Sequence, residues 1–255
     1  MSLAADVIAP AAIPPLVVRS EIVSADHPFA TAELLDLLPA QGGLAWVRDG
    51  AGLIGWGEAA RLVVRGRERF SRAQRWWAEV VRSADVHDAV HLNGSGIAAF
   101  ISFAFEPGRS VVVIPNVIVG RRDGVTWVTV ISRPDEAQID PRLLFDTRPP
   151  APPTGVVLWE EGTQPATKWQ RAVADAVERI HRGEVDKVVL ARDIVARSTQ
   201  PLDIRHLLNR LSRRYGECWA FAVDGLVGAT PELLVRRRGD MVTSRVLAGT
   251  VRRGK

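Results

Sequence analysis

The sequence predicts an α+β fold built mostly from antiparallel strands with flanking helices. Two patterns indicate this fold class. From about residue 86 to 131 the chain is rich in Val, Ile, Phe and Thr, and turn dipeptides separate runs of strand length. After residue 155, amphipathic helical segments alternate with β-rich segments. Strand runs followed by helix and strand runs favour α+β over a doubly wound parallel fold.

The first clear helix signal lies around residues 65–81. Five arginines fall between residues 65 and 75, and the net charge of +4 is otherwise spread along the chain. Apolar residues accompany them at helical spacing: Phe70, Ala73, Trp77, Val80 and Val81. We therefore expect an amphipathic helix with a solvated basic face, and no nucleic-acid partner, because no nucleic-acid-binding motif accompanies the charge.

The β-rich stretch and a proline-rich segment organise the first half. Turn signals at Asn93-Gly94, Pro107-Gly108 and Asp123-Gly124 predict an antiparallel meander. Four prolines in 147–155 then exclude regular structure, because proline fixes φ and lacks an N–H donor. The predicted division is a β-rich part over 1–146, a linker over 147–155 and a second region over 156–255.

Two helices are expected in the second region, over 167–182 and 203–215. In the first, Thr167 and Gln170 have the spacing of a capping box, and Gly183 follows as a stop. Both segments place their apolar residues on one helical face.

Strands are expected between and after these helices, over 186–196, 218–223, 226–237 and 241–250. Asp224-Gly225 is a favoured two-residue hairpin turn and joins the second and third of them. The turn at Gly239-Asp240 precedes the last.

Lys187 starts a strand-like run that continues with the apolar residues 188–191. A lysine in a strand buried on both faces would lose part of its hydration, which lowers its pKa and lets it act as a general base near neutral pH. The alternative is a lysine at the end of a strand that extends into water, which is the commoner situation. The residues alone leave both interpretations open.

Glu232 follows Pro231 and precedes an apolar run. In apolar surroundings the pKa of a carboxyl group rises, and a protonated carboxyl can serve as a general acid. The alternative is an ion pair with one of the arginines 236–238, and the residues alone favour that alternative.

The segment 247–250, Leu-Ala-Gly-Thr, is small and polar after a strand. Gly249 would let an anion approach the backbone amides, and Thr250 would add a hydroxyl donor. A plain turn at the end of a strand explains the segment equally well.

Composition restricts the compartment and the kind of metal site. The single cysteine, Cys218, excludes an internal disulfide framework and a cysteine-rich metal site. The apolar N-terminus carries Asp6 and lacks a basic leading segment, and no apolar run reaches the ~20 residues needed to cross a bilayer. We expect a cytoplasmic protein without a membrane partner.

Three segments together resemble, in order and spacing, signatures of the chorismate-binding enzymes: GEVDKVVLARDIV over 183–195, GATPELLVRR over 228–237 and VLAGT over 246–250. The segment DGAGLIGWGEAARL over 49–62 is also similar to the entry segment of actinobacterial isochorismate synthases. The resemblance implies a partial chorismate-utilising fold, and it implies isochorismate synthase activity within that family.

In that family the lysine at the position of Lys187 activates water, and the glutamate at the position of Glu232 protonates the departing C4 hydroxyl. Alanine at position 248 disfavours the aminodeoxychorismate branch, which carries lysine there. Ala248, Gly249 and Thr250 would meet the substrate, chorismate, and the product would be isochorismate. Mg²⁺ would be the cofactor, with ligands outside these 255 residues.

The resemblance also implies that a second half of similar length closes the fold, in the same chain or as a separate polypeptide. We expect the 255 residues alone to lack activity. Two alternatives stay open: a salicylate synthase of the same family, and a non-catalytic binding module that keeps half of the fold.

Overall fold

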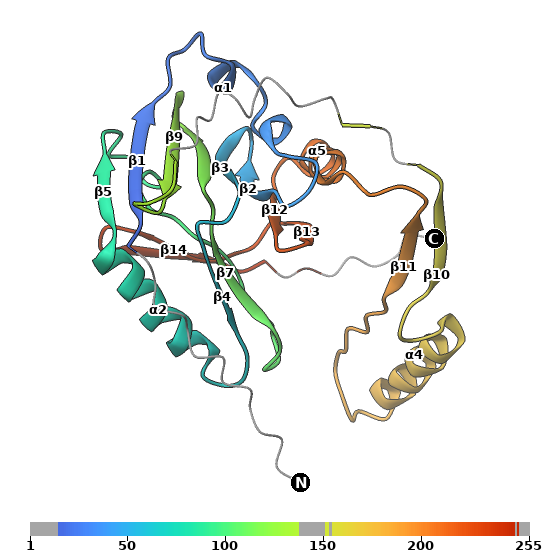
Figure 1. The fold of residues 1–255 in the computed structure, drawn as a ribbon. Helices are drawn as coiled ribbons and strands as arrows, with labels where there is room; N and C mark the ends of the chain where they lie inside the picture. The colour runs from blue at the N-terminus through green and yellow to red at the C-terminus, as the bar shows by residue number, and fades with distance from the viewer. Residues whose placement is uncertain (1–14, 138–150, 153–154, 248, 250–255) are drawn as a thin grey trace. The chain divides into compact units, whose positions relative to one another are not determined.

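A computed structural model describes residues 15–137, 151–152, 155–247 and 249 (Figure 1). The chain divides into two compact units. Unit 1 combines residues Met1–Ala151 with Ile204–Lys255, and unit 2 consists of Pro152–Asp203. The boundaries of these units differ from the division expected from composition, because 204–255 joins the N-terminal sheet. The predicted division at 147–155 stays a prediction.

An eight-stranded sheet forms the centre of unit 1. All its neighbouring strands pair antiparallel except β1 and β5, which pair parallel. Its strands, in sheet order, are β13 (Leu226–Thr230), β12 (Trp219–Val223), β2 (Leu44–Arg48), β3 (Ala51–Trp56), β8 (Val117–Arg122), β9 (Val125–Ser132), β1 (Val17–Ile22) and β5 (Asp85–Asp88). The expectation of a mixed fold with mostly antiparallel strands is confirmed.

Helical segments cover one face of this sheet. The segments are α1 (Pro28–Thr31), the 3₁₀ helix η1 (Leu34–Leu37) and α5 (Ile204–Arg214). Leu208 of α5 is fully buried and packs in one cluster with Ala45 and Val47 of β2 and with Ala220 and Ala222 of β12. This confirms the helix expected over 203–215 and its apolar face.

A second, three-stranded sheet and α2 (Arg69–Ser83) pack on the other face. This sheet has the order β4 (Ala60–Val64), β7 (Ser110–Ile114) and β6 (Phe100–Ser102). Helix α2 confirms the expected amphipathic helix, but its solvated basic face is only partly correct. Arg75 is exposed, whereas Arg69 is buried and donates to the backbone oxygens of residues 66, 104 and 105. Arg65 and Arg67 precede the helix. However, Trp76 is buried, while Phe70 and Val81 of the expected apolar face are exposed.

The expected meander over 86–131 is only partly correct. Asp123 and Gly124 do form the hairpin turn between β8 and β9, with positive φ at both residues. The chain leaves one sheet and enters the other between β7 and β8, where Pro115 lacks the N–H that a continuous ladder needs. Strand β5 pairs with β1 instead of with its sequence neighbours.

The end of unit 1 consists of two hairpins. The turn Asp224-Gly225 joins β12 and β13 as expected, and both residues have positive φ. The expected strand over 226–237 is interrupted at Pro231, and β14 (Leu233–Arg238) pairs instead with β15 (Met241–Arg245) in a separate two-stranded sheet.

Unit 2 contains α4 (Ala166–His181) and the antiparallel pair β10 (Val157–Glu161) and β11 (Ile194–Ser198). The helix expected over 167–182 is confirmed, and Gly183 follows it with φ 72°. The expected capping box is wrong: helix α4 begins one residue before Thr167, and the Ala166 N–H donates to Glu161 Oε2 at 3.1 Å. No residue of α4 is buried.

Candidate functional site

Lys187 lies in an irregular segment between α4 and β11, and it is exposed. Its neighbour Val189 is 82% exposed. The strand expected over 186–196 is therefore found only in its last part, as β11 from Ile194. Of the two interpretations of Lys187, the structure matches the side chain that extends into water. A strand needs a paired neighbour, and the β10–β11 ladder reaches only from Ile194 to Ser198.

The end of this segment is nevertheless anchored to the end of β10 and to the loop that follows it. The Thr163 N–H and hydroxyl both donate to the Asp193 carboxylate, at 2.9–3.0 Å and 2.8 Å. These bonds hold the pKa of Asp193 below its usual range, and the bond from the Thr163 backbone N–H has the largest effect. Gly162 lies against the same carboxylate, where a Cβ would clash. Arg192 pairs with Glu161 at 2.9 Å. Lys187 thus belongs to a segment fixed at its far end.

Glu232 lies in the short link between β13 and β14, and it is also exposed. Its N–H donates to Thr230 Oγ1 at 3.2 Å. Among the described residues, neither interpretation of this carboxylate is found: it has no apolar surroundings, and no ion pair joins it to the arginines 236–238, which the residues alone had favoured. Pro231 explains the position, because it ends the ladder of β13 and turns the next residue outward.

The predicted substrate-binding residues fall at the end of the described chain. Gly249 is exposed and has open space where a Cβ would stand. Ala248 and Thr250 lie outside the described residues. Lys187 belongs to unit 2, while Glu232 and Gly249 belong to unit 1. That Lys187 and Glu232 face one substrate remains a prediction.

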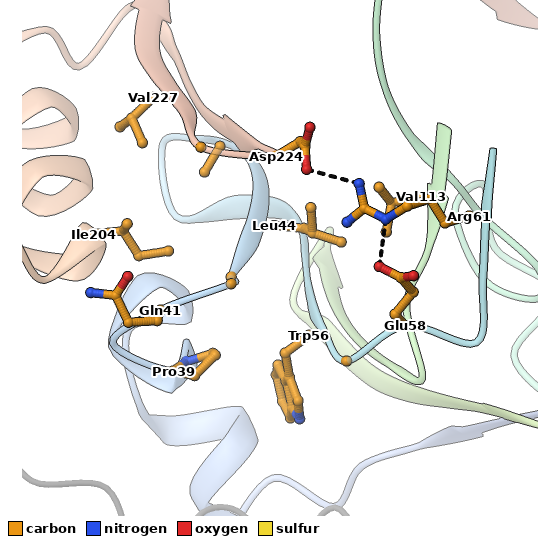
Figure 2. Close-up of a pocket in the computed structure, with 15 residues that line it drawn as sticks. Pro39, Gln41, Leu44, Trp56, Glu58, Arg61, Val113, Ile204, Asp224 and Val227 are labelled. Carbon is orange, nitrogen blue, oxygen red and sulfur yellow. Dashed lines mark hydrogen bonds and ion pairs between the residues drawn. The ribbon is translucent and has the colours of Figure 1, made fainter. Parts of the chain in front are cut away.

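Unit 1 also contains a cavity of about 580 Å³ that the sequence did not indicate (Figure 2). It lies between the loop 39–43, the start of β2, the end of β3 and the β12–β13 turn. Its apolar lining includes Leu44, Trp56, Val113 and Ile204. Neither Lys187 nor Glu232 lines it.

Charged side chains close one side of this cavity, as Figure 2 shows. Arg61 donates to Glu58 at 2.6 Å and to Asp224 at 2.8 Å, and Arg109 also pairs with Asp224. The bond from Arg109, with that from Arg61, lowers the pKa of Asp224. Burial alone would lower the pKa of Arg61, but its two carboxylate partners outweigh burial and raise it. One wall of the cavity is therefore made of ion-paired side chains.

The segment that builds part of this wall resembles the family in sequence, but its residues alone do not predict the cavity. The segment 49–62 supplies Trp56, Gly57, Glu58 and Arg61. Gly57 has φ 75° and lies against Asn116, whose side-chain oxygen accepts from the Glu58 N–H at 2.7 Å. In the sequence, a glycine at a tight turn was the available signal for this part of the wall. Asp224, which pairs with Arg61, lies far along the chain and could not be linked to it.

The described part of the chain contains neither a cluster of metal-ligating side chains nor a membrane-spanning helix. There, no group of three or more His, Cys, Asp or Glu side chains lies close enough together to hold a metal ion. The described acidic residues therefore do not fit a Mg²⁺ site. Among the described helices, none has both the length and the apolar character needed to cross a membrane.

Known proteins share both the sequence pattern and the fold. The chain is 36% identical over 90 residues to isochorismate synthase MenF of Bacillus subtilis (strain 168), a match that covers 34% of this chain and 19% of the relative. It is 26% identical over 239 residues to the salicylate biosynthesis isochorismate synthase of Pseudomonas aeruginosa, covering 83% of this chain and 49% of the relative.

The solved structure of MenF, the menaquinone-specific isochorismate synthase from Escherichia coli, has a similar fold. It superposes with a TM-score of 0.55 and 21% identity, covering 88% of this chain and 52% of that one. The chain thus spans about half or less of the length of these proteins. A family model described as "Chorismate binding enzyme" matches residues 22–255. Since that match includes nearly the whole sequence, the chain belongs to the chorismate binding enzyme family.

Proposed function

We propose that this chain forms part of an isochorismate synthase, which converts chorismate to isochorismate by adding water at C2 and removing the C4 hydroxyl. The observation that carries the proposal is Lys187 within DKVVLARD, in a chain whose family match extends over 22–255. The names of the relatives and the similar fold support the same activity.

In this proposal Lys187 takes a proton from water as the oxygen bonds to C2. The ring double bonds shift, the C4–O bond breaks, and Glu232 gives a proton to the departing hydroxyl. One water enters and one leaves, so the reaction is an isomerisation. The exposed positions of both side chains suit this proposal, because each is open to a ligand instead of being packed in a core.

Mg²⁺ also belongs to the proposal, as the family's expected cofactor. Because the described acidic residues do not fit such a site, we derive no step through the metal. Its ligands would come from another part of the complete enzyme, in the same chain or in a separate one.

A cytoplasmic location is likewise proposed, and the single cysteine supports it.

The test is to identify what the protein makes from chorismate. Residues 1–255 are incubated with chorismate and Mg²⁺, alone and fused to the second half of a relative. We expect isochorismate from the fused form, separated from chorismate by liquid chromatography and identified by its absorbance spectrum. Salicylate with one equivalent of pyruvate would assign the salicylate synthase alternative. Failure of both forms to consume chorismate would contradict an enzymatic role and favour a binding module.

A further inference from the structure

Two tryptophans stack on the face of the large sheet that lies opposite α5. Trp46 of β2 and Trp219 of β12 have ring centroids 5.2 Å apart and planes 14° apart. Strand register brings the two rings together. Trp46 lies opposite Phe221 of β12, and Trp219 is two residues before Phe221, so its side chain lies on the same face. The Phe221 ring extends the aromatic surface at 6.1 Å from Trp46.

Two arginines from different strands lie over this aromatic surface. The guanidinium carbon of Arg48 lies 4.9 Å from the Trp219 ring centroid, and that of Arg236 lies 5.5 Å from it. A guanidinium over an aromatic ring is held in place while its N–H groups remain free to donate sideways.

Three further arginines lie near enough to Arg236 for their charges to repel its own. We call the set the arginine patch, and it consists of Arg48, Arg122, Arg236, Arg238 and Arg245. Burial lowers the pKa of Arg236, and repulsion from the other four arginines lowers it further. The patch therefore carries concentrated positive charge at a partly desolvated position.

In the described part of the chain, no carboxylate pairs with the patch arginines, whereas several other arginines do have such partners. Arg61, Arg109 and Arg197 each pair with an acidic side chain. Within the part of the chain that the structure describes, none of the five patch arginines does so. The Nε of Arg122 is shielded from solvent and has no hydrogen-bond partner there. Such a donor costs free energy until an acceptor reaches it.

We propose that the arginine patch binds a small anion carrying two or more carboxylate or phosphate groups. Arg48 and Arg236 share one ring, so a compact ligand with two oxyanion groups can bridge them. The flanking arginines attract multivalent ions more strongly than chloride. A compact ligand fits better than an extended polyanion, because the two central guanidiniums converge on a single indole.

This proposal is independent of the proposed reaction. It uses neither Lys187 nor Glu232, and binding is measured without chorismate. A failure here would leave the isochorismate synthase proposal untouched, and the reverse also holds.

The experiment measures citrate and pyrophosphate binding to residues 1–255 by isothermal titration calorimetry, at constant ionic strength set with sodium chloride. We expect saturable binding of at least one of them, and the better ligand distinguishes a carboxylate site from a phosphate site. The double variant Arg48→Gln, Arg236→Gln should bind at least tenfold more weakly. The control Arg75→Gln, which removes an exposed arginine of α2, should bind like the parent protein.

Thermal unfolding supplies a second readout. The ligand should raise the Tm of the parent protein and of Arg75→Gln, but not that of the double variant. Arg245→Gln alone, at an exposed position, should weaken binding about threefold even if the double variant folds poorly. Absence of saturable binding at constant ionic strength, or equal affinity of parent and well-folded variants, would overturn the proposal. Binding of polyglutamate without binding of either small anion would overturn it too.

Discussion

Lys187 and Glu232 both lie on irregular links, and this placement gives their proposed roles a direct test. In a form that converts chorismate, Lys187→Ala should reduce kcat at least about 100-fold, because the attacking water loses its base. Glu232→Gln should do the same, because an amide keeps the shape of the side chain but cannot deliver a proton. The measurement is steady-state turnover of chorismate to isochorismate.

Matched controls exist for both substitutions. Lys168→Ala changes another exposed lysine of unit 2, and Glu217→Gln changes another exposed glutamate of unit 1. Both should keep near-parent rates. Since Lys187 and Glu232 are exposed, their variants should also keep the parent Tm, so a lost rate would not reflect unfolding. A near-full rate in either variant would remove that residue from its role.

Asp224 predicts a pH-dependent stability. Its pKa lies below the ordinary 3.8 because Arg109 and Arg61 donate to the folded carboxylate. The stabilisation is thus complete above pH 4 to 5 and disappears as pH falls through the lower, folded pKa. Asp224→Asn should lower the Tm by roughly 2–6 °C at pH 6, with the difference shrinking below about pH 4.

Asp123→Asn is the control, because Asp123 occupies a hairpin turn of the same kind, with φ 50° against 51° for Asp224. Asparagine is tolerated at both positions and both variants lose one negative charge, so they differ in that only Asp224→Asn also loses the ion pairs with Arg61 and Arg109. The measurement is thermal unfolding by circular dichroism from pH 3 to 7. A constant Tm difference over that range would show that the ion pairs do not cause it.

At the residue scale, features that depend on adjacent residues could be predicted from the sequence. Asp224-Gly225 predicted its turn because positive φ at both positions favours those residues. The ion pairs of Asp224 with Arg61 and Arg109 could not be predicted, because they join distant parts of the chain. For Lys187, apolar neighbours suggested burial, but burial requires a partner strand that those neighbours do not specify.

At the scale of the elements, β8 and β9 depend on one glycine. Gly120 pairs with Trp127, and a Cβ at Gly120 would fall inside the indole of that fully buried residue. Gly120→Ala should therefore lower the free energy of unfolding by about 2–4 kcal/mol, because the ring has no space to move into. Urea denaturation measures the change. Gly216→Ala, where a Cβ meets open space, should change it by less than about 1 kcal/mol.

Equal effects of the two glycine substitutions would contradict the tight packing of β8 against Trp127.

At this scale the sequence predicted most of the elements. Helical periodicity located α2, α4 and α5, since it depends only on nearby residues. Strand runs were located as well, but the sequence did not reveal which strands pair, as β5 beside β1 illustrates.

For the whole molecule, unit 1 depends on segments from both ends of the chain. β12 and β13 complete the sheet beside β2, and α5 buries Leu208 against it. A variant that ends at Asp203 should expose Ala45 and Val47 of β2 and should aggregate or remain unfolded. Circular dichroism and size-exclusion chromatography measure this outcome.

A companion variant replaces residues 152–203 by a flexible Gly-Ser linker of about 20 residues. It should keep unit 1 folded, with a single cooperative unfolding transition. A folded, monomeric protein ending at Asp203 would contradict the view that the last strands are essential to the sheet.

The sheet order β13-β12-β2-β3 also has a consequence for synthesis on the ribosome. Strand β2 emerges early and pairs with β3 at once, but its other edge must wait until Trp219–Val223 has been translated. At about 5–20 residues per second this delay is on the order of ten seconds or more. Throughout that time the nascent chain carries an open strand edge next to Trp46, a target for premature pairing with another chain. Chaperone dependence during translation is therefore expected to concentrate on this edge.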